Sequence, residues 1–315
     1  MSSFKEIDLS RVKTHKAADR KSLVHASVEA VPPEKGMTFR EFLDRLPGLL
    51  KADDLKSIAD DVIRAKQKSK PVIAMLGGHV IKTGCSPVLI DLLKRGFITH
   101  VASNGAAAIH DTELARFGTT SEDVADSLGD GSFGMAEDTA ALVNRAAQNA
   151  SKGGKGFGEA VGEELLKENP PFIDRALVAC AHQLAVPYTL HVALGTDIVH
   201  QHPSADGGAI GDASLRDFRI FASSVSEIGN GGVVLNLGSA VIMPEVFLKA
   251  LSVSRNLGHD VKNFTTANFD IIQHYRPDVN VVRRPVVPGG NGYAITGHHE
   301  IMIPLLAAAI YEGSD

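Results

Sequence analysis

Residues 71–84 read PVIAMLGGHVIKTG, and this stretch decides the fold. Five apolar residues, 72–76, form a run as long as a buried strand, and Pro71 ends the helical pattern before it. Gly77 and Gly78 follow the run at once and open a second helical pattern. A short apolar strand that ends in a glycine turn is typical of an α/β sheet, and it lets a ligand approach the backbone closely.

The same unit recurs along the chain. Apolar residues spaced i, i+3, i+4, i+7 and i+8 predict a helix before this strand, at Leu55, Ile58, Ala59, Val62 and Ile63. Further short strands are expected at 99–103, 188–193, 233–237 and 264–268. Helices are expected at 88–95, 135–150, 158–167, 173–184, 214–228 and 244–257. This alternation predicts an α/β protein: a Rossmann-like parallel sheet with helices on both faces, forming one domain over 37–315.

Residues 1–36 differ in character from that domain. They are polar, they end in VPPEKG, and residues 1–25 hold six Lys/Arg against three Asp/Glu. We expect an N-terminal arm that wraps the body or a neighbouring subunit, or else a frayed tail.

Composition excludes several classes of protein. The chain has 315 residues, 44% hydrophobic and 22% charged, with a net charge of −5, which is typical of a globular protein. A basic nucleic-acid-binding domain is not indicated, and no apolar run is long enough to span a membrane. Two cysteines cannot form a disulfide framework, so we expect a cytoplasmic protein. We expect its partner to be a small-molecule substrate, with no nucleic acid and no membrane.

Polar residues gather directly after the predicted strands. In an open parallel sheet, ligands bind outside the carboxyl ends of the strands. The stretches at those positions are GGHVIKTG (77–84), SNGAAAIHD (103–111), GTDIVHQHPSADGGAIGD (195–212), GSAVIMPE (238–245), TTANFD (265–270) and TGHHE (296–300). The sequence therefore predicts a polar site at one edge of the sheet.

The first of these loops resembles a phosphate cradle without matching a regular motif. Backbone N–H groups at a helix start can bind phosphate, and Lys82 would add a charge. Its spacing is neither G-x-x-x-x-G-K-[ST] nor G-x-G-x-x-G, so a plain tight turn is the alternative. In the next loop, Asp111 would bind a hydroxyl or orient a histidine, or else would be a first-turn acid. Asp212 is a candidate N-cap of the helix after it.

Histidines supply the candidate acid–base groups. His200 and His202 would point the same way in an extended segment and would form half of a metal site with His191 or Asp206. No complete metal motif is present, so proton transfer by His202 beside Asp206 is the other hypothesis. His299 is either an acid–base group or a structural cap.

At these loops the sequence resembles the deoxyhypusine synthase-like NAD-binding superfamily, over roughly residues 72–311. The matching segments, in order, are MLGGHVIKTG, ASNGAAAIHD, HPSADGGAIGD, LGSAVIMPEVFLKAL, FTTANFD and YAITGHHEIMIPLLAAAIYE. A second resemblance is to the NAD-dependent C-terminal domain of arginine dihydrolase/ornithine cyclodeaminases, whose signature is similar to NGAAAIHDTELARFGTT (104–120).

The resemblance implies bound NAD and the residues that hold it. These are Gly77, Gly78, Lys82, Thr83, Asn104, Gly105, Asp111, Asp212, Gly238, Ser239, Thr266, Ala267, Gly297 and His298. The catalytic candidates are His202, Asp206, Glu245 and His299. Ala294 stands where the synthase has its catalytic lysine, and Pro244 and Glu245 replace its histidine pair. Because a covalent enzyme–amine intermediate needs that lysine, the chain is not expected to be a true deoxyhypusine synthase.

These expectations converge on an NAD-binding enzyme that oxidises a small amine or alcohol. It would be an NAD-dependent oxidoreductase, transferase or deaminating cyclase. The alternatives are a metal-assisted hydrolase or lyase built on His200, His202 and His299, and a nucleotide-binding protein without catalysis. The resemblance also implies a homo-oligomer, a dimer or tetramer.

Overall fold

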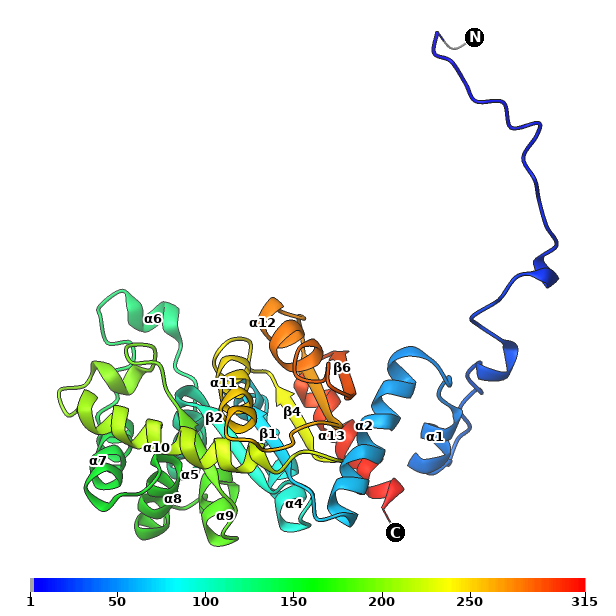
Figure 1. Ribbon diagram of the computed structural model, residues 1–315. Helices are drawn as coiled ribbons and strands as arrows, with labels where there is room; N and C mark the ends of the chain where they lie inside the picture. Colours follow the sequence, from blue (N-terminus) through cyan, green and yellow to red (C-terminus); the bar gives the residue numbers. More distant parts are fainter. Residues whose placement is uncertain (1–2, 315) are drawn as a thin grey trace.

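Six parallel strands form one sheet in the order β3-β2-β1-β4-β5-β6 in a computed structural model of the chain, which describes residues 3–314 (Figure 1). The strands are β1 (Val72–Leu76), β2 (His100–Asn104), β3 (Tyr188–His191), β4 (Val233–Leu237), β5 (Phe264–Asp270) and β6 (Gly290–Thr296). The Rossmann-like parallel sheet expected from the sequence is therefore confirmed.

Helices cover both faces of the sheet. The α-helices are α1 (Phe39–Arg45), α2 (Leu50–Gln67), α3 (Gly78–Lys82), α4 (Ser86–Lys94), α5 (Gly105–Phe117), α6 (Val124–Leu128), α7 (Glu137–Gly153), α8 (Phe157–Glu168), α9 (Leu177–Gln183), α10 (Gly207–Ser226), α11 (Ile242–Asn256), α12 (Tyr275–Pro277) and α13 (His299–Gly313). Shorter turns of 3₁₀ or π helix are η1 (Ala17–Asp19), η2 (Ala26–Val28), η3 (Ile173–Arg175), η4 (Ile198–Gln201) and η5 (Asp278–Arg283).

Strand β1 is buried on both faces, as its uninterrupted apolar run predicts. Val72, Ala74 and Leu76 pack into the larger hydrophobic cluster, with α2, α4 and α13. Ile73 and Met75 point into the smaller cluster, with residues of α10 and α11. Both faces of the sheet are therefore covered by packed side chains. The loops at the ends of the strands are left as the place for a site.

Two elements differ from the sequence prediction. Strand β6 was not expected, because its sequence GNGYAIT has no apolar run and Gly290, Asn291 and Gly292 are exposed at the edge of the sheet. Helix α10 begins at Gly207, not after Asp212. The side chain of Asp206 caps it by accepting a hydrogen bond from the backbone N–H of Ala209 (3.0 Å), so Asp212 as the N-cap is wrong.

Two buried histidines lie between the sheet and α10. His100 Nε2 and His191 Nε2 are 2.9 and 3.0 Å from the Thr189 hydroxyl, and both rings contact Phe221 edge-on. Burial lowers the pKa of each histidine to about 3. Both rings are therefore neutral in the folded protein at all ordinary pH values.

We expect His191→Gln to make stability less sensitive to acid. The unfolded chain protonates this histidine near pH 6.5, whereas the folded protein does so only near pH 3. Its contribution is complete above pH 6.5 and is lost, by about 1.4 kcal/mol per pH unit, as the pH falls. Urea unfolding at pH 7.5, 6.0 and 5.0 should show this extra loss in the wild type and not in the variant.

The comparison with the variant is needed because other buried groups change the free energy of unfolding in the opposite direction as the pH falls. Burial raises the pKa of Asp111 and Asp217 to about 7, so these carboxyls favour the folded state more as the pH falls. They are present in both proteins and cancel in the difference. Equal slopes for the two proteins would show that His191 is already charged in the folded state.

Candidate functional site

The order of the strands reverses between β1 and β4. From β1 the chain runs outward to β2 and β3, and it then returns to build β4, β5 and β6 on the other side. The glycine turns after these strands are tied to the neighbouring strand. Gly77 N–H donates to the Leu237 carbonyl, and Gly238 N–H donates to the Phe269 carbonyl, each at 3.0 Å. Ligands of open α/β sheets bind in the crevice at such a reversal.

The two turns lie too close together for side chains. A Cβ atom on Gly77 would be 2.0 Å from the carbonyl oxygen of Gly238. Gly238 has φ +67°, and a Cβ atom there would be 2.7 Å from Nε2 of His299. Glycine is therefore required at both positions, because the protein's own atoms fill the space beside each of them.

His299 is a buried titratable group that lies against the Gly238 turn. It begins α13, is 1% exposed, and its Nε2 is 3.3 Å from the Phe269 carbonyl oxygen. Nδ1 of His299 is buried and has no hydrogen-bond partner in residues 3–314. The ring of His79, from α3, contacts it edge-on at 5.5 Å between centroids. Burial lowers the pKa of His299, although the Asp270 carboxylate acts to raise it.

A cavity of about 470 Å³ lies next to the segments that follow the carboxyl ends of β2 and β3. Charged and polar residues contribute to its wall together with apolar side chains of α5, α6 and η4. The main lining residues are Lys82, Ile109, His110, Glu113, Phe133 and Asp197. Helix α3 connects the two regions, because His79 contacts His299 and Lys82 lines the cavity.

A hydrogen-bond network holds the polar wall of this cavity. The Thr120 hydroxyl donates to Glu113 (2.5 Å) and lies 2.7 Å from Nδ1 of His110, and Thr139 also donates to Glu113. Burial, with a smaller effect of the Lys82 ammonium group, lowers the pKa of His110 to about 4. His110 is therefore neutral at pH 7.

Asp197 contributes a second carboxylate. Its side chain lies against the start of α5, where a Cβ atom on Gly105 would be 1.9 Å from Oδ2. Burial raises the pKa of Asp197, and His200 opposes that effect. Gly105 is therefore small because a carboxylate occupies the space beside it.

Several of the predicted cofactor residues meet at this edge of the sheet. Gly77, Gly78, Gly105 and Gly238 form the turns, and Ser239 is buried, with Oγ accepting from the Met243 N–H (3.2 Å). Asn104 caps α5 by accepting from Ala107 N–H, and Thr83 donates to the His79 carbonyl. Gly297 and His298 lie in the turn between β6 and α13.

Three predicted cofactor residues lie inside the protein instead. Asp111 is fully buried and accepts hydrogen bonds from the backbone N–H groups of Leu177 and Val178, both at 2.9 Å, so it holds the start of α9. Thr266 and Ala267 are in the middle of β5, where both are fully buried. These three cannot touch a cofactor at the strand ends. Asp212 is exposed on α10 near Arg216.

The predicted pair of His202 and Asp206 does not form. Nδ1 of His202 lies 2.8 Å from the Ser204 hydroxyl, whereas Asp206 caps α10. His200 does not align with His202, because it lies in η4, where its Nδ1 accepts from the backbone N–H groups of Gly195 and Asp197. Within residues 3–314, no group of three or more His, Cys, Asp or Glu side chains is placed to hold a metal ion.

Glu245 lies in the first turn of α11 and is already paired. Its carboxylate contacts Lys249, Arg276 and Asn280. The hydrogen bond from Lys249 contributes most to the lowered pKa of Glu245. It is an ionised carboxylate held by cations, not a free base.

Sequence reasoning missed five residues of the site: His79, Glu113, Thr120, Asp197 and Asp270. His79 stood inside the quoted glycine loop, and Glu113 and Thr120 stood inside the quoted signature 104–120. Their positions in those segments were the available signal. The sequence did not show that the loop after α5 places Thr120 within hydrogen-bond distance of His110.

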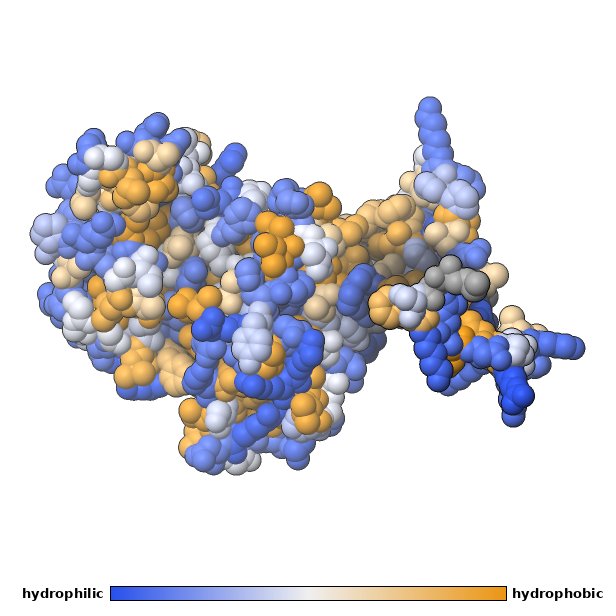
Figure 2. Space-filling model, turned by 90° about the horizontal axis from the view of Figure 1, so that it is seen from above, coloured by the Kyte–Doolittle hydropathy of each residue, from blue (hydrophilic) through white to orange (hydrophobic). Residues whose placement is uncertain are grey.

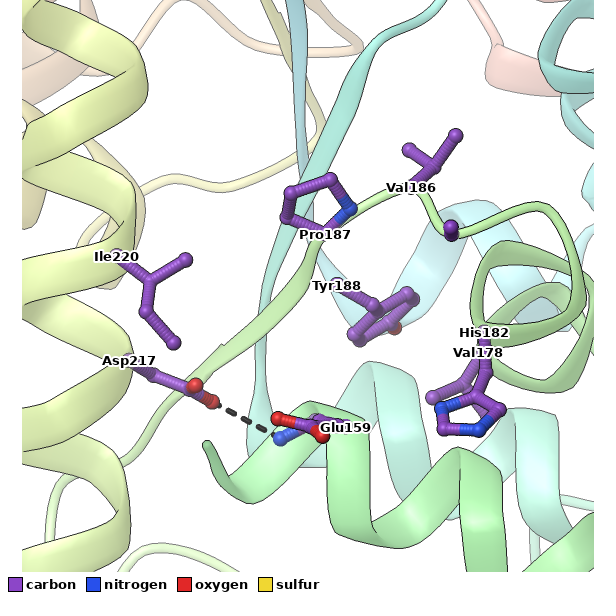
Figure 3. Close-up of a pocket in the computed structure, with 10 residues that line it drawn as sticks. Glu159, Val178, His182, Val186, Pro187, Tyr188, Asp217 and Ile220 are labelled. Atoms are coloured by element: carbon purple, nitrogen blue, oxygen red, sulfur yellow. Dashed lines mark hydrogen bonds between the residues drawn. The ribbon is translucent and has the colours of Figure 1, made fainter. Parts of the chain in front are cut away.

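A second cavity, about 330 Å³, lies near the amino end of β3. Figure 3 shows Asp217 of α10, Glu159 of α8 and Tyr188 of β3 around it. Asp217 Oδ2 accepts from the backbone N–H groups of Gly158 (2.9 Å) and Leu190 (2.7 Å). It thereby caps the outer edge of β3, which is the reason for its burial.

No helix within residues 3–314 is both long and apolar enough to cross a membrane.

Known proteins resemble part of this chain in sequence. A family model, described as the C-terminal Rossmann-fold domain of arginine dihydrolase ArgZ-like proteins, matches residues 56–149. This range contains the crevice turn after β1 and the network of His110, Glu113 and Thr120. An ornithine cyclodeaminase from Methanothermobacter thermautotrophicus is 24% identical over 98 residues, which are 30% of this chain. The chain spans only 24% of the length of that relative.

Solved structures share the fold over most of the chain. AgrE, crystallised with ornithine and NAD⁺, aligns with a TM-score of 0.55 at 13% identity, covering 82% of this chain and 32% of AgrE. A putative LOR/SDH protein from Methanococcus maripaludis aligns at 0.51 and 16% identity, covering 89% of this chain and 73% of that protein. A putative deoxyhypusine synthase from Entamoeba histolytica aligns at 0.51 and 10% identity, covering 91% of this chain and 98% of that one. The expected resemblance to the arginine dihydrolase C-terminal domain is confirmed in sequence over residues 56–149, and the resemblance to deoxyhypusine synthase-like proteins is confirmed for the fold.

Proposed function

We propose that the protein binds NAD across the reversal point of the sheet and uses it to oxidise a small amine substrate. The carrying observation is that the glycine turns after β1 and β4 meet at the reversal point, packed so closely at Gly77 and Gly238 that only glycine fits. In dinucleotide-binding sheets the pyrophosphate lies at a glycine turn of this kind. AgrE, which shares the fold, was crystallised with NAD⁺ and ornithine.

The cavity beside the crevice fits the adenosine half of the cofactor. Rossmann sheets bind the two nucleotide halves on opposite sides of the reversal point. On the β2 and β3 side, Asp197 and Glu113 carry carboxylates that would accept hydrogen bonds from ribose hydroxyls, and Lys82 would meet a phosphate. The apolar side chains of Ile109 and Phe133 would flank the base.

The β4 and β5 side would then hold the nicotinamide, which accepts a hydride when it is bound. There, His299 is neutral because burial lowers its pKa, and Nδ1 has no partner. A neutral imidazole can take the proton that leaves an amine or alcohol during its oxidation. Asp270 lies close enough to favour the protonated ring that results.

Calorimetry with NAD, followed by substrate screening, tests this proposal. We expect micromolar NAD binding, weakened about tenfold in Lys82→Ala, since one phosphate contact is lost. Ornithine, arginine, lysine and simple diamines are then incubated with the protein and NAD, and their consumption is followed by NMR. Absence of NAD binding at millimolar concentration would disprove the proposal. Binding without consumption of any amine would instead favour a nucleotide-binding protein without catalysis.

A further inference from the structure

Strand β6 ends the sheet with an open edge. Among residues 3–314, strand β5 is the only strand that pairs with it, and the only side-chain hydrogen bond to its backbone comes from Gln273 to the Ile295 carbonyl. Gly290, Asn291 and Gly292 are exposed. At the opposite end of the sheet, by contrast, Asp217 and Ser214 of α10 cap the outer edge of β3. An uncovered edge is a template for pairing with another segment of chain.

The described part of the N-terminal arm is largely exposed. Residues 3–25 extend away from the body, and further along the arm the Gly48 N–H donates to the Val28 carbonyl and the Val31 N–H donates to the Arg45 carbonyl (Figure 1). Ile7, Leu9 and Val12 are 84%, 67% and 60% exposed. Seen from above, the arm lies beside the body and shows both hydrophobic and hydrophilic residues (Figure 2). Burying these apolar side chains against another surface would be favourable.

Charge favours a second copy of the chain as the partner. The whole chain carries −5 and residues 1–25 carry +3, so the remaining residues carry −8. Acidic residues of α2 lie near Tyr293 of β6, and Arg64 and Lys68 lie beside Gly290 and Asn291. Burial raises the pKa of Tyr293 in β6, and the carboxylates of Asp53, Asp54 and Asp61 on α2 raise it further. Asp53 is exposed and has no ion-pair partner within the described range.

Position and length also fit. The arm leaves the body beside α1 and α2, on the same side of the molecule as β6 (Figure 1). A strand alongside β6 needs about seven residues, and an extended arm of more than twenty provides them with residues to spare. The arm points away from its own body, so a neighbour on this side would receive it.

We propose that residues of the segment 3–13 in one copy add as a strand to the open edge of β6 in a second copy. The extended backbone would supply the missing hydrogen bonds, and Ile7 and Leu9 would be buried. The segment holds Lys5, Arg11 and Lys13 against Glu6 and Asp8, so it would bring a net charge of +1 near the exposed Asp53 of α2. This inference is independent of the proposed NAD chemistry.

Sedimentation of the full chain with substitutions in the arm tests self-association. We expect a dimer that Ile7→Asp with Leu9→Asp weakens about 100-fold, because burying each side chain contributes roughly tenfold in affinity. Leu257→Asp is the matched control, since Leu257 is 71% exposed just after α11 and its substitution should leave the dimer intact. Raising the salt concentration should also weaken the wild-type dimer. A monomer, or a dimer unaffected by the arm substitutions, would overturn the proposal.

Disulfide trapping tests the contact itself. Copies with Leu9→Cys and differently tagged copies with Asn291→Cys are mixed and oxidised; the native Cys85 and Cys180 are buried. We expect a cross-link between the two tags, and none when Leu257→Cys replaces Asn291→Cys. Absence of the cross-link between the two tags would contradict the proposed contact. A protein that carries both Leu9→Cys and Asn291→Cys gives a second check, because a cross-link within one chain would show that the arm pairs with its own β6.

Discussion

Replacing Gly77 by alanine is expected to abolish NAD binding and to destabilise the protein. The added methyl group would be 2.0 Å from the Gly238 carbonyl oxygen, so the turns after β1 and β4 must separate by more than an ångström. Backbone strain has no part in this effect, because Gly77 has φ −96° and ψ 161°, which alanine adopts freely. We expect at least a 100-fold loss of NAD affinity by calorimetry. Urea unfolding should show a loss of about 1–3 kcal/mol, the usual cost of overpacking.

Gly211→Ala is the control for this substitution. Gly211 lies within α10, and a Cβ atom there has no neighbour within 4 Å. Alanine should raise the free energy of unfolding by about 0.5–1 kcal/mol, because it has the higher helix propensity. NAD affinity should not change. Wild-type stability and NAD binding in Gly77→Ala would show that the two turns are not held together in solution.

The parts of this fold that were predictable are those set by local pattern. The strand 72–76 is a continuous apolar run closed by a proline and two glycines, and burial on both faces demands that pattern. Strand β6 has no such pattern, because an edge strand with exposed glycines needs few apolar residues. Its place is determined by pairing with β5 along seven residues, a long-range contact that no local window contains.

The location of the candidate site was predictable from the sequence. The identity of the residues that form it was less so. That the strand ends form a ligand-binding edge follows from parallel topology alone. Asp111 illustrates the limit. Its neighbour His110 reaches the cavity, but one residue further along α5 the side chain turns into the core and holds α9. The sequence places both residues in one signature, and only the rotation of the helix separates their roles.

The predicted alignment of His200 with His202 is absent for a related reason. Its spacing from His200 is informative only in an extended segment, and the structure forms a 3₁₀ turn there. His299, by contrast, has no periodic signal of its own. It enters the crevice because α13 starts directly after β6 and begins next to the turns at the carboxyl edge of the sheet.

Substituting His299 is expected to separate catalysis from cofactor binding. Under the proposed function, His299→Gln removes the proton acceptor and keeps a donor near the Phe269 carbonyl. Turnover of the amine identified by screening should fall by about 10²–10⁴, the usual contribution of a positioned acid–base group. NAD affinity should stay within threefold. His259→Gln is the control, because His259 is exposed in the segment after α11 and should leave both turnover and NAD affinity unchanged.

The pH dependence of turnover gives a second test, and the NMR titration of His299 gives one that needs no known substrate. Burial lowers the pKa of His299 below its ordinary value of 6.5, so the ring stays neutral at pH 6.5 and is protonated only in more acidic solution. A proton acceptor must be neutral, so turnover should persist at pH 6.5 and fall below it. The NMR resonance missing from His299→Gln should titrate over the same range and should shift when NAD is added. A His299 that titrates at or above pH 6.5, or a variant with full turnover, would contradict its assignment as the proton acceptor.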